Sequence, residues 1–296
     1  EPELSPAVRA LIERAERHRN LYLQLSEDLY DEEERSHFSP PRVAQGATPA
    51  EWAKTARRWL NLNDTNDFHS YRSAVESRGI FVIRSMGYRG QWRVPDESEV
   101  AGFSLYHSTC PVVFVRKQAH ENRQSFTLMH ELGHLLMHAS SFVDNESDFS
   151  EQTGREHEAN AFAGCVLVPP EFVNSIPDGS YRVPVPELSA SLRDYTRAWG
   201  VSTEVLLRRL LDSGRIEAET YRAYRAWQSQ QPPGVASSGS RAYRAREPLH
   251  IFGQRFVRTV LDALHGRQIS LNKASTYLDH LKIKDVHTLE QRIADV

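Results

Sequence analysis

Two histidines with helical spacing are the residues of this sequence best suited to bind a metal. His130 and His134 begin and end the motif HELGH, inside a run that otherwise has the apolar pattern of a buried helix. Residues four apart project from the same helix face, so both imidazoles can bind one zinc ion. Glu131 can then take a proton from a water whose pKa the ion lowers. The motif predicts a catalytic zinc centre with Glu131 as its general base.

The apolar surroundings of the motif strengthen this prediction. Two histidines and a glutamate would form a costly buried cluster unless a metal or another partner satisfied them. Gly133, inside the motif, costs about 1 kcal/mol relative to Ala in a helix and indicates the close approach of another backbone. A chance occurrence of the motif is the weaker alternative.

A third ligand should come from a second helix packed beside the first. The segment Glu156–Ala163 carries acids next to small residues that permit close packing. Glu158 is the preferred candidate, because it lies four residues before Phe162 at the edge of the buried side. Glu156 and His157 are its rivals. A further alternative is that all three only solvate the first turn of a helix and complement its dipole.

Three more polar residues are secondary candidates. His138 follows His134 by four residues, and we expect it to support the site or lie at the surface rather than act as another ligand. Tyr106 and His107, near the end of a predicted strand, could line the cleft and stabilise an oxyanion. A role on the surface of the sheet is the favoured alternative for both.

The elements around these residues predict an α+β fold. Amphipathic helices begin at Pro6 and, behind a Thr48–Glu51 capping box, at Pro49. Four short runs rich in β-branched and aromatic residues predict a small antiparallel sheet: 80–83, 91–94, 102–106 and 112–115. Helical periodicity returns over 122–139 and 151–168. We therefore expect a small sheet beside a zincin-like metal helix, with helical extensions at both ends.

Composition shifts divide the chain into four regions. They are a helical segment with a linker at 1–47, the unit with the zinc motif at 48–228, a flexible linker rich in Pro, Gly and Ser at 229–247, and a small helical region at 248–296. The first residues show no signal-peptide pattern, and the lack of an initial Met suggests that the natural chain begins further upstream.

Composition also excludes several classes of protein. The 296 residues hold 36 Lys and Arg against 39 Asp and Glu, a net charge of −3, which argues against a protein that coats nucleic acid or a membrane surface. No apolar stretch reaches the length of a membrane span. Two cysteines far apart give no disulfide framework, so we expect a cytoplasmic protein with thiols in its core or loops.

The two motifs resemble those of ImmA/IrrE-type metallopeptidases. The match consists of the run from Arg123 to His138 and the run from Glu158 to Pro169, and the resemblance covers about residues 80–228. Met129 stands where a small residue often precedes the first motif, but this departure is apolar. The resemblance implies that His130 and His134 are zinc ligands, Glu131 the water-activating base and Glu158 the third ligand.

The resemblance also implies a function. It predicts a cytoplasmic zinc endopeptidase that cleaves a specific protein, such as a helix-turn-helix repressor of a mobile element or stress response. No helix-turn-helix is evident in the first 60 residues, so DNA binding would need a domain before Glu1. The alternative is a non-catalytic regulatory or antitoxin-like protein whose metal only supports the fold. Two histidines, one glutamate and a free base leave a metal position open, which favours the enzyme.

Overall fold

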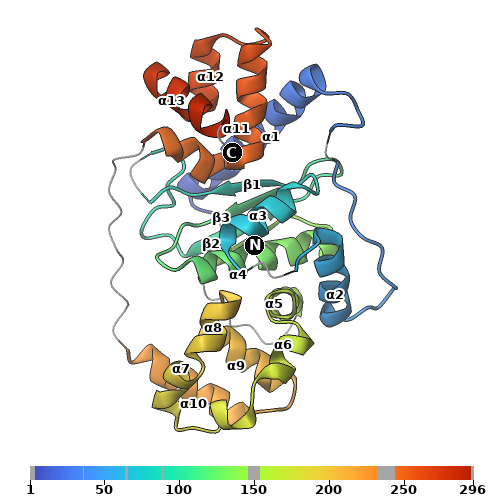
Figure 1. Ribbon diagram of the computed structural model, residues 1–296, viewed down its shortest axis with the longest axis vertical. Helices are drawn as coiled ribbons and strands as arrows, with labels where there is room; N and C mark the ends of the chain where they lie inside the picture. Colours follow the sequence, from blue (N-terminus) through green and yellow to red (C-terminus); the bar gives the residue numbers. More distant parts are fainter. Residues whose placement is uncertain are drawn as a thin grey trace.

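A small sheet crosses the middle of the molecule and carries helices on both faces (Figure 1). The computed structural model describes residues 4–35, 37–63, 66–87, 90–145, 154–231 and 244–294. Most of the predicted linker at 229–247 lies outside the described residues. The architecture is α+β, as the sequence predicts.

The sheet is mixed rather than antiparallel. Its strands are β1 (Phe81–Arg84), β2 (Val100–Leu105), β3 (Val112–Val115) and β4 (Phe142–Asn145), in the order β1-β3-β2-β4. The β1–β3 pair is parallel, while β2 is antiparallel to both β3 and β4. The chain after β1 passes beyond the position of β3 before it forms β2, so β3 is inserted between them. The prediction of a wholly antiparallel sheet is therefore wrong.

Two further differences concern single segments. The predicted strand at 91–94 is a loop, in which Trp92 and Val94 supply the apolar contacts that suggested a strand. Strand β4 was not predicted, because its short sequence Phe-Val-Asp-Asn precedes a run of acids that has the composition of a loop.

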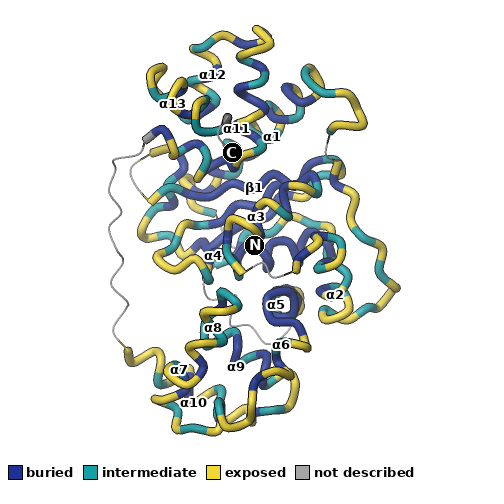
Figure 2. The backbone as a smooth tube through the Cα atoms, in the orientation of Figure 1, coloured by how far each residue is buried: buried dark blue, intermediate teal, exposed yellow. Residues whose placement is uncertain are grey.

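One face of the sheet is covered by α4 (Glu121–Gly133), which carries most of the histidine motif, and by α3 (Phe68–Glu76). Helices α5 (Gly154–Leu167) and α2 (Pro49–Leu60) form a further layer, in which α5 packs on α4 and α2 packs on α5. The Thr48–Glu51 capping box is present at the start of α2, as predicted. Helix α4 continues into a π-helical turn, η1 (His134–His138). Figure 2 shows buried backbone concentrated in the sheet, α4 and α5, where the first apolar core lies.

The opposite face is covered by helices from distant parts of the chain. They are α1 (Pro6–Leu29) and α11 (Glu247–His265), with α12 (Leu271–Tyr277) packed on α11 and α13 (Ile283–Ala294) packed on α12. Ser5 caps α1 and Pro6 occupies its first turn, as the sequence indicates. Helices α1 and α11 pack against each other and, with the outer side chains of the strands, form a second apolar core.

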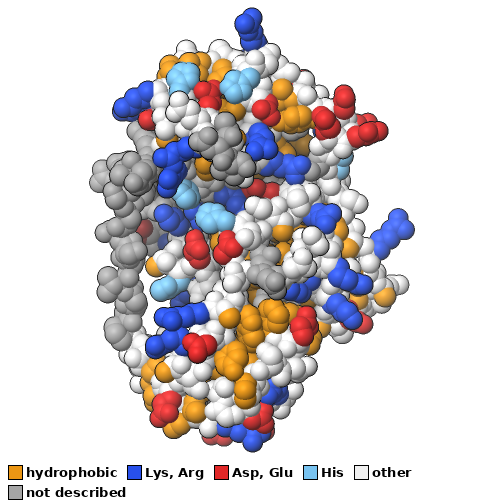
Figure 3. Space-filling model, viewed as in Figure 1, with side chains coloured by type: hydrophobic (Ala, Val, Ile, Leu, Met, Phe, Trp, Pro, Cys, Tyr) orange, Lys and Arg blue, Asp and Glu red, His pale blue; other side chains and the backbone are white. Residues whose placement is uncertain are grey.

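Shorter helices complete the molecule below α5. They are α6 (Pro170–Ser175), α7 (Leu188–Ser191), α8 (Arg193–Trp199), α9 (Thr203–Asp212) and α10 (Ala218–Ser229). Within the described residues, none of the helices has the length and apolar character to cross a bilayer. Acidic and basic side chains are interspersed over the face seen in Figure 3, in keeping with the small net charge.

His18 of α1 is enclosed by aromatic rings in the second core. Its ring centroid lies 4.9 Å from that of Trp92 and 5.0 Å from that of Phe252. Its Nδ1 donates to the carbonyl oxygen of Arg14 at 3.1 Å. Burial disfavours the charged imidazolium and lowers the pKa of His18 to about 4.

Acidification is expected to destabilise the protein through His18. Between pH 6.5 and 4 the unfolded chain binds a proton that the folded chain excludes, so the free energy of unfolding falls as the pH falls. The loss from this residue is on the order of 2–3 kcal/mol. Denaturant unfolding across this range measures it, and a His18→Gln variant should lose less stability than the parent. An equal loss in both proteins would assign the acid sensitivity to other groups.

Candidate metal centre

Helix α4 presents the histidine motif toward α5. His130, Glu131 and His134 are all fully buried. A Cβ on Gly133 would lie 3.0 Å from Cδ1 of Phe162 and 3.4 Å from Cα of Ala159. The backbone of α5 therefore approaches α4 closely at this glycine, which confirms the reason inferred for it from the sequence.

Four side chains converge beside α4. His130, His134, Asp144 and Glu156 each offer one donor atom, and these atoms all lie within 4.8 Å of one another. The two Nε2 atoms are 3.0 Å apart, and Oε2 of Glu156 lies 3.2 and 3.4 Å from them. Two imidazole nitrogens that face each other at this distance need a proton or a cation between them. Imidazole and carboxylate donors suit zinc, so the group fits a metal ion of this kind.

Hydrogen bonds behind the two histidines fix their orientation. Nδ1 of His130 donates to Oδ1 of Asn160 at 3.0 Å. Nδ1 of His134 lies 3.0 Å from Nδ1 of His138, whose Nε2 lies 2.9 Å from Oε2 of Glu158. Donation from His134 to His138 and from His138 to the carboxylate satisfies this chain. Both Nε2 lone pairs are thereby left for the shared site, the arrangement that metal-binding histidines require.

The structure brings Glu156, rather than the preferred Glu158, to the histidines. The Glu156 side chain is 20% exposed and faces them, whereas that of Glu158 is 52% exposed and pairs with His138. Residues two apart on a helix point about 200° apart, while Glu156 and Asn160, four apart, share the face toward His130. His157, the other rival, lies outside the four-residue group. The face of α5 that meets the histidines is therefore not the one inferred from the position of Phe162.

Glu131 lies beside the sheet at β2. Its Oε1 is 2.5 Å from where a Cβ of Gly102 would stand, so the missing side chain makes room for the carboxylate. No hydrogen bond of good geometry satisfies either carboxylate oxygen among the described residues, although the side chains of Asp144 and Ser104 lie close enough to act on it. Burial raises the pKa of Glu131 well above its usual range, and the charge of Asp144 adds to the shift. A nearby cation would oppose both effects.

Comparison with known families agrees with this geometry. Residues 93–211 match the model of a peptidase family described as the IrrE N-terminal-like domain. The chain contains an IrrE N-terminal-like peptidase domain. The match begins just before β2, includes the histidine motif, β4 and α5, and ends in α9. It confirms the resemblance found in the sequence. No curated protein matches the chain.

The remaining candidates of the IrrE-like domain are not among the four donors. His138 holds His134, as described above. Tyr106 is exposed, with its ring against Phe38. Nδ1 of His107 accepts hydrogen bonds from the backbone N–H groups of Thr109 and Cys110 in the turn after β2. Tyr106 and His107 both lie outside the four-residue group.

Asp144 is the member of the site that the sequence did not reveal. The acidic run from 144 to 158 has the composition of a solvated loop, yet Asp144 is buried and Glu156 faces the histidines. The sequence signal that could have identified Asp144 is the alternation of side chains along a strand, which places Phe142 and Asp144 on the same face. Phe142 stacks on the His134 ring with centroids 4.1 Å apart.

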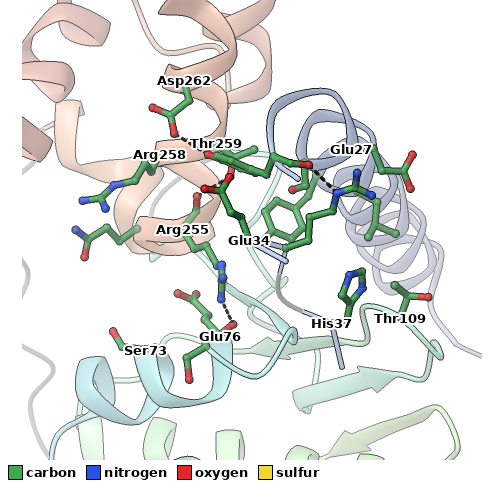
Figure 4. Close-up of a pocket in the computed structure, with 17 residues that line it drawn as sticks. Glu27, Glu34, His37, Ser73, Glu76, Thr109, Arg255, Arg258, Thr259 and Asp262 are labelled. Atoms are coloured by element: carbon green, nitrogen blue, oxygen red, sulfur yellow. Dashed lines mark hydrogen bonds between the residues drawn. The ribbon is translucent and has the colours of Figure 1, made fainter. Parts of the chain in front are cut away.

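A cavity elsewhere in the protein is separate from the IrrE-like site. It measures about 580 Å³ and lies among α1, α3 and α11 (Figure 4). Arg255 lines it and donates to the carbonyl oxygen of Glu76 at 2.7 Å. None of the four metal-type donors is among its lining residues.

Proposed function

We propose that this protein is a zinc-dependent endopeptidase. The observation that carries the proposal is the convergence of His130, His134 and Glu156 beside the unpartnered carboxylate of Glu131. These three residues would hold the ion, with Asn160 and His138 orienting the two imidazoles. Zinc in this place would polarise a scissile carbonyl and lower the pKa of water.

Glu131 supplies the proton transfers of the reaction. Its carboxylate accepts a proton from the attacking water as the new C–O bond forms, and it later delivers that proton to the leaving amine as the C–N bond breaks. The buried position of Glu131 against β2 supports this role, because no hydrogen bond of good geometry from the described residues holds its oxygens. Gly102 keeps the space that the carboxylate occupies.

The proposed substrate is one DNA-binding regulator, cut in an exposed segment, in the cytoplasm. The family resemblance motivates this choice, and a peptidase domain implies a protein substrate. Helices α6–α10 on one side of the site and the α1–α11 layer on the other offer surfaces that can hold one partner and position one bond. The two cysteines of the chain are free and buried, which suits a reducing compartment.

The proposal of a single substrate is tested by comparing the cleavage of candidate regulators with the cleavage of casein. The zinc-loaded protein is mixed with each candidate and with casein, and the products are resolved by mass. We expect one dominant cut in one regulator and little digestion of casein. Efficient casein digestion at many sites would contradict a single-partner enzyme.

The fourth donor, Asp144, favours a second candidate function. A zinc ion closed by four protein ligands is typical of a structural site, and such a site would suit a regulatory or antitoxin-like binding protein. Tight binding of a regulator that is never cut, by protein shown to contain zinc, would support this alternative over the peptidase.

A further inference from the structure

Asp144 occupies a place for which the proposed reaction has no use. Its Oδ2 lies 3.4 Å from Nε2 of His130 and 3.5 Å from Nε2 of His134, on the same site as Glu156. The side chain is 1% exposed, and no hydrogen bond of good geometry satisfies Oδ2 among the described residues, although the side chains of His130 and Glu131 lie beside Asp144. A buried carboxylate is stable when it is paired or binds a metal. The oxygen thus has the environment of a metal donor.

The site combines features of a structural zinc site with features of a catalytic one. Four converging protein donors are typical of a closed structural site, whereas a catalytic site keeps one position for water or substrate. Glu131, next to the donors, is suited to a water that the closed arrangement would exclude. Departure of one donor would reconcile the two features.

Asp144 is the donor that lies on a strand rather than on the packed helices. His130 projects from α4, His134 from the turn η1 that continues it, and Glu156 from α5, which packs closely against α4. Asp144 instead lies on β4, which is an edge strand and, among the described residues, pairs with β2 alone. The β2–β4 ladder shifts register between Val100 and Gly102, directly at the partner of Asp144. Edge strands with an interrupted ladder separate from a sheet more readily than central strands.

We propose that Asp144 is a fourth, displaceable zinc ligand that keeps the peptidase closed at rest. Release of Asp144 with β4 frees the metal position for water and substrate, and it places that position beside Glu131. The same movement uncovers the edge of β2, to which an extended peptide can add as a strand. This inference rests on the proposed function, since it assumes that the histidine site binds metal.

Cobalt(II) in place of zinc allows a test that does not depend on peptidase activity. The visible spectrum of bound cobalt reports its ligands, and acetohydroxamate serves as a small probe for an open metal position. In the parent protein we expect weak binding of the probe. In Asp144→Ala we expect the probe to bind at least about tenfold more tightly, and cobalt itself to bind about 10–100-fold more weakly.

Two further variants keep the test decisive. Asp144→Asn preserves the shape of the side chain and should show the same direction of change if Asp144→Ala fails to fold. Asn145→Ala, on the same strand but with its side chain on the other face, should behave like the parent.

The outcomes separate this inference from the proposed function. Equal probe binding by the parent and both Asp144 variants, with cobalt retained, would overturn the closed resting state and leave the metal site intact. Complete loss of cobalt from both variants would make Asp144 a permanent ligand and overturn its displacement. A parent protein that binds no cobalt or zinc would refute the proposed function itself.

Discussion

Replacing Glu131 by Gln is expected to abolish cleavage while zinc and the fold are retained. The amide is nearly isosteric with the carboxylate but cannot accept the proton of the attacking water. Loss of a general base lowers the rate by about 10²–10⁴-fold. Zinc content should not fall, because the donor atoms belong to His130, His134, Asp144 and Glu156. Turnover of the regulator and metal analysis of the same preparation measure both quantities.

Glu121→Gln provides a matched control for this experiment. Glu121 lies in the first turn of the same helix, α4, but outside the four-residue group. Its variant should cleave and bind zinc like the parent. Normal cleavage by Glu131→Gln would refute general-base catalysis by Glu131. Loss of zinc from that variant would give the residue a role in metal binding that the proposal does not include.

The second large effect is expected at the start of α5. Glu156→Ala should lose most of its zinc, since the Glu156 carboxylate lies within 3.4 Å of Nε2 in both histidines. Glu158→Ala should retain zinc with an affinity lowered about tenfold or more, because Glu158 acts only through His138 on the orientation of His134. Competition with a chelator of known affinity gives both values.

The pair of glutamates serves as its own control. Both are acids in the first turns of α5, so a general effect of charge on the helix would weaken zinc binding equally in the two variants. Full zinc in Glu156→Ala together with loss in Glu158→Ala would restore the assignment made from the sequence. It would also mean that α5 is rotated about its axis so that Glu158, rather than Glu156, faces the histidines.

The sequence was sufficient where the chemistry depends on neighbours along the chain. The spacing of His130 and His134 places them on one helix face independently of the rest of the fold. A glycine at position 133 indicates that a second helix packs closely there. The choice between Glu156 and Glu158 depends instead on the rotation of α5 about its axis. That rotation is set by packing on α4, which no local pattern encodes.

Asp144 and β4 were missed for a related reason. A four-residue strand at a sheet edge has few apolar positions to display, and its pairing with β2 joins segments about 40 residues apart. The parallel pairing of β1 with β3 is likewise decided by the path of the chain between strands. By contrast, the capping box at Thr48 is a local signal, and it placed the start of α2 correctly.

The second apolar core has a consequence for modularity. Phe103 and Phe114, both inside the family domain, stack face to face within a core that also contains Phe81 of β1 and Phe256 of α11. These latter residues lie outside 93–211, as does the whole of α1. Excised alone, the segment with the metal centre would expose one side of its sheet to water. The segment that carries the metal centre is therefore smaller than the unit that folds. A recombination event that transferred residues 93–211 alone would transfer the site without the helices that stabilise its sheet.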